Sequence, residues 1–233
     1  MKAPPTALAR RLSEIRGRIA AAAERSGRSE GAVTLIGVAK TVASALVAEA
    51  IEAGLADVGE SRVQEALLTI DSVGRRAARW HMIGHLQRNK VTKAVQTFDR
   101  IHGVDSFELA EVVSKHSQAA NLRMPVLVQV NVSGEPAKHG VSPDALESLL
   151  ARMVELPGIA LDGLMSIGAA VERADDARRE FALTRELRDR AERALGLALP
   201  QLSMGMSGDY EVAVEEGSTL VRVGTALFGQ RTT

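Results

Sequence analysis

Eight short apolar runs, separated by stretches with helical character, constrain the fold of this chain more than any other feature. The runs lack the strict polar alternation of a half-exposed sheet, as expected of parallel strands that are buried on both faces. The predicted strands are 33–40, 56–60, 80–84, 100–104, 125–131, 160–167, 200–204 and 220–224. Because strands alternate with helices, the order predicts an α/β protein with a parallel sheet or barrel.

Helix boundaries agree with these strand predictions. Gly54 and Gly196 each follow a helical stretch and suit the left-handed conformation that ends many helices. Ser61-Arg-Val-Gln64 has the pattern of a capping box that starts a helix. Ser142 precedes a proline, which is favoured at the first helical position. The predicted ends and beginnings of the helices therefore fall between the predicted strands.

A helix is predicted at residues 6–25, before the first strand, whereas only residues 226–233 follow the eighth. We expect the early helix to cover the side of the barrel that a missing last helix would leave open. With 233 residues and 45% apolar content, the chain can bury one large core. The prediction is a single domain over residues 1–233, a (β/α)8 TIM barrel with an extra N-terminal helix.

Charge and cysteine content exclude several classes of protein. Lys plus Arg equals Asp plus Glu at 29 each, so no net charge attracts the chain to nucleic acid or to an anionic membrane. The absence of cysteine excludes disulfides, thiolate metal sites and thiol nucleophiles, and it favours a reducing compartment. Neither a secretion signal nor a membrane-length apolar run is present. We expect a cytoplasmic protein without nucleic-acid or membrane partners.

Lys40 ends the first predicted strand, in Leu35-Ile-Gly-Val-Ala-Lys40. In a (β/α)8 barrel the working residues gather at the C-terminal ends of the strands. An apolar surrounding there disfavours the ammonium form, and a neutral amine can attack an aldehyde. The alternative explanation of this lysine is an ion pair with a carboxylate such as Glu60.

Two segments of small residues, 203–209 and 223–229, follow the seventh and eighth predicted strands. Ser207 precedes a short predicted helix whose first N–H groups suit a phosphate, although an ordinary N-cap is the alternative. Gly224 permits close approach of the backbone to an anion, and Thr225 adds a hydroxyl. Their position opposite Lys40 predicts a site for a small phosphorylated aldehyde.

Other side chains are candidates for contacts with a ring. Arg222 lies between two valines and is expected to point into the barrel mouth, with an ion pair as the alternative. An arginine facing a pyridine nitrogen can only donate, so that nitrogen must be an unprotonated acceptor. Met165 is a candidate for packing on a flat ring, although a core methionine is the commoner explanation. His81 and His85 lack the spacing of a metal motif, so we predict structural or rim positions and no metal site.

Six segments, in order along nearly the whole chain, resemble the pyridoxal-phosphate homeostasis proteins. They are Gly-Val-Ala-Lys40-Thr, Gly59-Glu-Ser-Arg-Val-Gln-Glu65, Trp80-His-Met-Ile-Gly-His-Leu-Gln-Arg-Asn-Lys90, Gly163-Leu-Met-Ser-Ile-Gly168, Leu202-Ser-Met-Gly-Met-Ser207 and Val221-Arg-Val-Gly-Thr-Ala-Leu-Phe-Gly229. The resemblance implies a fold-type III barrel, like the N-terminal domain of alanine racemase, with pyridoxal 5'-phosphate (PLP) as cofactor. It also implies Lys40 as the Schiff-base lysine, phosphate contacts from Ser207, Gly224 and Thr225, and Arg222 near the pyridine nitrogen.

One departure from the family is Ser61, where the family usually has asparagine after Gly-Glu, so no ring contact is carried over to this position. The resembling racemases need a second base, a tyrosine, whereas the only tyrosine here, Tyr210, lies beside the proposed phosphate helix. We therefore expect a monomer with no catalytic residues that binds PLP, delivers it to PLP-dependent apoenzymes and acts in vitamin B6 homeostasis. The alternatives are a weak PLP-dependent amino-acid racemase and a cofactor-free aldolase in which Lys40 attacks a sugar phosphate.

Overall fold

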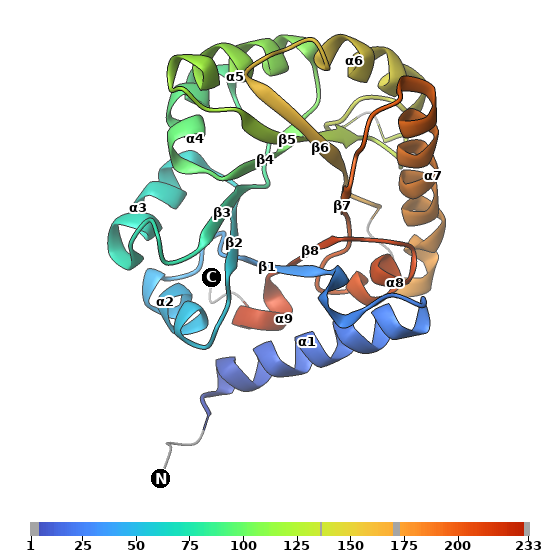
Figure 1. Cartoon of the computed structure of the whole chain (residues 1–233). Helices are drawn as coiled ribbons and strands as arrows, with labels where there is room; N and C mark the ends of the chain where they lie inside the picture. Colours follow the sequence, from blue (N-terminus) through green and yellow to red (C-terminus); the bar gives the residue numbers. More distant parts are fainter. Residues whose placement is uncertain (1–4, 136, 170–172, 231–233) are drawn as a thin grey trace.

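The eight predicted strands form a closed parallel barrel in the computed structural model of this protein, which describes residues 5–135, 137–169 and 173–230 (Figure 1). Each strand pairs with its neighbours in the sequence, and β8 pairs with β1 to close the ring. The strands are β1 (Thr34–Val38), β2 (Asp57–Glu60), β3 (Arg79–Met82), β4 (Arg100–Val104), β5 (Met124–Val130), β6 (Ile159–Ser166), β7 (Gln201–Ser203) and β8 (Leu220–Val223). The predicted (β/α)8 fold is thus confirmed.

Helices cover the outside of the barrel between consecutive strands (Figure 1). They are α2 (Ser44–Glu52), α3 (Val63–Val73), α4 (Val91–Thr97), α5 (Phe107–Ala119), α6 (Leu146–Met153), α7 (Arg178–Leu195), α8 (Tyr210–Glu215) and α9 (Thr225–Phe228). Gly196 ends α7 in the left-handed conformation, as predicted. The predicted capping box at Ser61 is wrong, because α3 begins at Val63 with Arg62 at the cap and no side-chain cap bond.

The N-terminal helix α1 (Ala7–Arg25) lies against α8 and α9 on the outside of the barrel (Figure 1). The Thr6 hydroxyl caps it by accepting the Ala9 N–H at 3.1 Å. Its buried residues recur every three or four positions, as in an amphipathic helix, and are Leu8, Leu12, Ile15, Ile19, Ala22 and Ala23. Because α9 has only 4 residues, α1 supplies the apolar cover for this part of the barrel, as predicted.

The interior of the barrel holds two kinds of side chain. An apolar cluster is formed by Ile36, Leu127, Met165 and Leu220. Besides Glu60, which contacts α3, the buried polar side chains on the strands are Asp57, His81, His102, Gln129, Ser166, Ser203 and Arg222. The larger apolar core lies between the strands and the surrounding helices. Polar groups inside a barrel must find hydrogen-bond partners there, and this requirement shapes the site described below.

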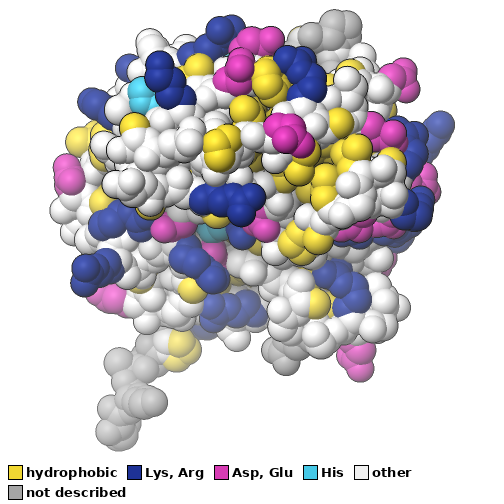
Figure 2. Space-filling view, turned by 45° about the horizontal axis from the view of Figure 1, so that its top comes forward, with side chains coloured by type: hydrophobic (Ala, Val, Ile, Leu, Met, Phe, Trp, Pro, Cys, Tyr) yellow, Lys and Arg dark blue, Asp and Glu magenta, His cyan; other side chains and the backbone are white. Residues whose placement is uncertain are grey.

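Charged side chains are spread over the outer surface. On the face that Figure 2 shows, Lys and Arg side chains are interspersed with Asp and Glu side chains. Many are paired, as Arg178 is with Glu215 and Glu216. Within the described residues, no helix has the length and apolar character that crossing a membrane requires.

Strand β6 carries a bulge where it pairs with β5. Val126 pairs with Leu161 whereas the next residue, Leu127, pairs with Gly163, so Asp162 is the extra residue. Gly163 has φ +153°, and a Cβ at this position would lie 1.8 Å from the Gln201 carbonyl oxygen. Only glycine fits this bulge, because any side chain would collide with the backbone of β7.

We expect Gly163→Ala to lower the free energy of unfolding by roughly 2–5 kcal/mol, because it adds both steric overlap and an unfavourable backbone conformation. Gly196→Ala is the matched control, since Gly196 also has a positive φ of +63° but has nothing within 4 Å of the added Cβ. That change should cost only about 1 kcal/mol. Urea unfolding of both variants measures the difference. Equal losses would show that the close contact at the bulge is unimportant.

Candidate functional site

Lys40 lies two residues beyond the end of β1, in a tight turn. The turn is closed by the Val42 N–H, which donates to the Ala39 carbonyl at 2.8 Å. Thr41 has φ +62°, which is uncommon for a β-branched residue, and its hydroxyl donates to the Lys40 carbonyl at 2.6 Å. Backbone strain of this kind costs of order 1–3 kcal/mol and clusters at functional sites. Thr41 could not be singled out from the sequence, because the strain shows only in the folded backbone.

A cavity of about 330 Å³ at the C-terminal ends of the strands brings the predicted residues together. Its wall contains five of the six predicted cofactor-binding residues, which are Lys40, Ser207, Arg222, Gly224 and Thr225. The other lining residues are Val38, Ser61, Ile83, Ile167, Met206 and Gly208. The Lys40 amine and the two segments predicted to bind an anion, residues 203–209 and 223–229, therefore share one opening. We call these two segments the anion segments.

Met165 is the predicted cofactor-binding residue that the structure places elsewhere. It is fully buried in the barrel interior, in the cluster with Ile36, Leu127 and Leu220. Ile167, two residues further along the chain, lines the cavity instead. An apolar contact to a bound ring at this side of the site would therefore come from Ile167.

Lys40 is not paired with Glu60, the alternative partner considered above. Among the described residues, the only ion pair made by a lysine joins Lys138 to Glu135. Glu60 instead accepts a long hydrogen bond from Thr69 of α3 at 3.4 Å. Burial, and then repulsion by Glu65, raises the pKa of Glu60 to about 7. The carboxylate therefore belongs to the packing of α3 rather than to the cavity.

The prediction that Ser207 begins the helix that follows it is wrong, because α8 starts three residues later at Tyr210. Its hydroxyl instead accepts the N–H groups of Gly224 and Ala226, at 3.2 and 3.3 Å. These groups belong to the start of α9. Ser207 therefore ties the loop after β7 to the first turn after β8, a contact that spans the two predicted anion segments.

Three backbone N–H groups in this region remain available to a ligand. Within the part of the chain that the structure describes, the N–H groups of Ser207, Gly208 and Thr225 have no acceptor in the protein. All three residues line the cavity. Backbone N–H groups that converge on one space form a binding site for an anion such as phosphate.

Arg222 points from β8 into the barrel and is only 4% exposed. Its guanidinium donates to the Ser203 hydroxyl at 2.7 Å and to the Ser166 carbonyl at 2.9 Å. Both acceptors are neutral, in contrast to the ion pair that was the alternative. Burial lowers the pKa of Arg222 to about 10, although nearby Asp209 favours the charged form. Arg222 thus remains a cation at neutral pH and forms part of the cavity wall.

A chain of buried hydrogen bonds connects Arg222 to Asp57 at the opposite end of the barrel. Ser203 Oγ lies 2.9 Å from His102 Nδ1, His102 Nε2 lies 3.0 Å from His81 Nδ1, and His81 Nε2 lies 2.9 Å from Asp57 Oδ1. Burial, and then the positive charges nearby, hold the pKa of His102 well below its usual value. Arg222 donates at one end of this chain of hydrogen bonds, the carboxylate of Asp57 accepts at the other, and the roles of the imidazole nitrogens between them depend on the tautomer of each ring.

Asp57 ends this chain as a carboxylate. Burial acts to raise its pKa, but hydrogen bonds from His81 and Arg79 outweigh burial, so the pKa of Asp57 lies below its usual value. Arg79 binds it through two parallel hydrogen bonds of 2.8 and 2.7 Å. His81 thus has the structural position that was predicted. The buried hydrogen-bonding roles of His102 and Ser203 were not predicted. The signal in the sequence that could have indicated them is a polar residue within a buried apolar strand.

His102 makes the stability of the protein depend on pH. Unfolded histidine takes up a proton near pH 6.5, whereas the buried ring in the native protein does not at that pH. The unfolded state therefore binds more protons at acidic pH. The contribution of His102 to stability is complete above about pH 6.5 and is lost as the pH falls below it.

We expect Ser203→Ala to lower the free energy of unfolding by roughly 2–3 kcal/mol, because it leaves a donor of Arg222 and the Nδ1 atom of His102 buried without partners. Ser117→Ala is the matched control, since Ser117 is equally buried but its hydroxyl has no hydrogen-bond partner among the described residues. It should change stability by less than about 0.5 kcal/mol. Urea unfolding at pH 8 compares the two variants. A loss in Ser203→Ala no greater than in the control would contradict the chain as a stabilising element.

The comparisons with known proteins agree with this fold. The sequence family described as alanine racemase, N-terminal domain, matches residues 11–232. A pyridoxal phosphate homeostasis protein of Aquifex aeolicus is 44% identical over 221 residues, covering 95% of this chain and 97% of the relative. The protein of the same name from Pseudomonas aeruginosa is 40% identical and covers 96% of both chains.

Solved structures show the same likeness. PipY of Synechococcus elongatus, solved with PLP bound, is 35% identical with a TM-score of 0.85 and covers 95% of this chain and 100% of its own. Alanine racemase of Clostridium difficile shares the fold at 16% identity with a TM-score of 0.74, covering 97% of this chain and 57% of the enzyme. From its sequence and its barrel together, this chain belongs to the pyridoxal phosphate homeostasis protein family.

Proposed function

We propose that this protein binds pyridoxal 5'-phosphate as an aldimine of Lys40 and acts in intracellular vitamin B6 homeostasis or delivery, without strong catalytic activity. The observation that carries the proposal is the shared cavity, in which the Lys40 amine, the free N–H groups of the anion segments and the Arg222 guanidinium line one space of about 330 Å³. The names of the relatives and the PLP bound to PipY support the same ligand.

Each part of PLP has a matching group in the cavity wall. The amine of Lys40 can condense with the aldehyde with loss of one water molecule. The N–H groups of Ser207, Gly208 and Thr225, with the Thr225 hydroxyl, suit the phosphate. Arg222 can only donate to the pyridine nitrogen, which then stays unprotonated. PLP supplies an electron-withdrawing ring when it is bound, and an unprotonated nitrogen weakens that property.

The position of Tyr210 supports a carrier rather than a racemase. This tyrosine, the only one in the chain, is 2% exposed at the start of α8. Its ring lies beneath the guanidinium of Arg18 in α1 and is not part of the cavity wall. It is therefore poorly placed to act as a second base on a bound cofactor. We infer that PLP-dependent apoenzymes receive the cofactor, and that the protein works as a monomer because one chain supplies the whole cavity wall described here.

The most direct test is borohydride reduction of the PLP-loaded protein followed by peptide mapping. Reduction turns the imine into a stable secondary amine, so the pyridoxyl label should be found on the peptide that contains Lys40. Lys40→Ala should lose the label. Lys90→Ala is the matched control, because Lys90 lines an adjoining cavity that Lys40 also reaches, and it should keep the label in full.

Three results would contradict this proposal. Label on another lysine in the unaltered protein would refute the role of Lys40. A purified protein that fails to take up PLP would instead favour a cofactor-free aldolase. Rapid racemisation of alanine or serine by the PLP-loaded protein, lost in Lys40→Ala, would replace the carrier role with an enzymatic one.

Ser207→Ala should weaken the retention of PLP without abolishing the covalent link to Lys40. It removes a polar group that also positions the N–H groups of Gly224 and Ala226, so we expect roughly a tenfold rise in the dissociation constant, about 1.4 kcal/mol. Ser26→Ala, at the end of α1, should leave the constant unchanged. Fluorescence titration with PLP measures both. An unchanged constant in Ser207→Ala would exclude Ser207 from the phosphate site.

A further inference from the structure

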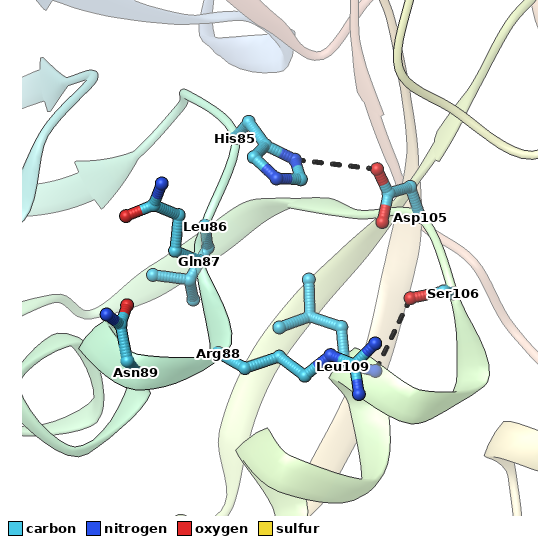
Figure 3. Close-up of a pocket in the computed structure, with 8 residues that line it drawn as sticks. All are labelled: His85, Leu86, Gln87, Arg88, Asn89, Asp105, Ser106 and Leu109. Carbon is cyan, nitrogen blue, oxygen red and sulfur yellow. Dashed lines mark hydrogen bonds and ion pairs between the residues drawn. The ribbon is translucent and has the colours of Figure 1, made fainter.

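Three side chains at the rim of the barrel direct their donor atoms toward one another. His85 follows β3, Asp105 follows β4 and His139 lies in the loop after β5, so they come from three adjacent strand ends. One donor atom from each lies within 4.8 Å of the other two. Figure 3 shows the ring of His85 turned toward the carboxylate of Asp105. We call these three residues the rim cluster.

The spacing in the rim cluster suits a metal ion better than hydrogen bonds. The Nδ1 atoms of His85 and His139 lie 3.6 and 3.8 Å from the same oxygen of Asp105, too far for good hydrogen bonds. Zinc binds nitrogen and oxygen ligands at about 2.0–2.2 Å, which separates neighbouring ligands of a tetrahedral site by roughly 3.3–3.6 Å. The two separations from Asp105 are therefore close to those of a metal site, and the two histidine donor atoms lie within 4.8 Å of each other.

The backbone under the rim cluster is held in place. The carbonyl of His139 accepts a hydrogen bond from the buried side chain of Gln129 at 3.0 Å. Gly84, directly before His85, packs so closely on Ser61 that a Cβ there would lie 2.4 Å from the Ser61 carbonyl oxygen. Asp105 directly follows the last residue of β4. The three positions are thus fixed relative to one another by the barrel.

The side chains above this backbone have the freedom that metal binding requires. The two imidazole rings stack with centroids 4.0 Å apart and planes at 11°. Because a metal ion lies in the plane of each ring that binds it, one ring must turn about its Cβ–Cγ bond. The side chains of His85 and His139 are 43% and 57% exposed, so this turn meets little steric resistance. The amine of Lys138, the residue before His139, is paired with Glu135 and not with Asp105.

We propose that the rim cluster binds one divalent transition-metal ion, with Zn²⁺ as the natural occupant. Two imidazoles and one carboxylate suit Zn²⁺ and its neighbours in the transition series, whereas Mg²⁺ and Ca²⁺ prefer sites made of oxygen. A cavity of about 490 Å³ beside His85 and Asp105 leaves room for water or a small ligand in the remaining coordination position (Figure 3). Histidine spacing along the sequence did not predict this site, because its donors come from three separate strand ends.

The site also adjoins the opening that contains Lys40. His85 lines a further cavity, of about 460 Å³, together with Lys40 and Ser61. A bound ion would therefore add positive charge at the edge of this opening. The metal site itself needs no cofactor and stands independently of the function proposed above.

Isothermal titration of the full-length, untagged protein with Zn²⁺ and with Mg²⁺ tests the proposal. We expect one Zn²⁺ per chain and no uptake of Mg²⁺. His85→Ala, Asp105→Asn and His139→Ala should each reduce Zn²⁺ affinity by at least roughly 10- to 100-fold. A loss of this size is known for residues that only hydrogen-bond to a metal ligand, and removal of a ligand itself should cost no less. His116→Ala is the matched control, because His116 lies on α5 outside the rim cluster, and it should bind as tightly as the unaltered protein.

Histidine ¹H–¹⁵N NMR spectra of the unaltered protein provide a readout that depends on no variant. Addition of Zn²⁺ should shift the ring signals of His85 and His139 and leave those of His116 in place. Failure to bind one Zn²⁺ per chain would overturn the proposal. Zn²⁺ affinity that survives in both His85→Ala and His139→Ala, or ring shifts confined to other histidines, would overturn it as well.

Discussion

The buried positive charge of Arg222 is the constraint on which the interior of this barrel depends. A guanidinium that is 4% exposed requires acceptors that the strands themselves supply. Ser203 and Ser166 provide two oxygen atoms, and the hydrogen bonds continue from Ser203 to the carboxylate of Asp57. Inward positions on β2, β3, β4, β7 and β8 are polar for this reason, and the apolar cluster that contains Met165 fills the rest of the interior.

The first helix supports a site that is formed by residues at the other end of the sequence. The anion segments lie on the last two βα units, where α8 and α9 are too short to cover the barrel alone. Helix α1 packs on both of them, Arg11 donates to the Leu227 carbonyl at 2.7 Å, and Arg18 pairs with Glu211. The N-terminal segment thus supports the part of the backbone in which the N–H groups of Ser207, Gly208 and Thr225 have no acceptor among the described residues.

Most of the fold was predictable from local patterns. Alternating apolar runs and helix signals predict a parallel sheet or barrel, and eight strands in this order favour the (β/α)8 barrel. Five of the six predicted cofactor-binding residues could be placed at one opening for the same reason, since the C-terminal ends of all the strands meet there. Met165 could not be placed, because a buried methionine looks the same in sequence whether it borders a ring or fills the core.

What the sequence determined by itself is therefore the order of the strands, the helix that precedes them and the set of residues at their C-terminal ends, because these follow from periodicity and chain direction. Only the tertiary structure decided which side chains meet across the barrel. The partner of Ser207 in α9, the link from Arg222 through His102, and the rim cluster all join residues from different βα units. Such contacts depend on strand register and on bulges such as that at Gly163, which arise only when the strands pair.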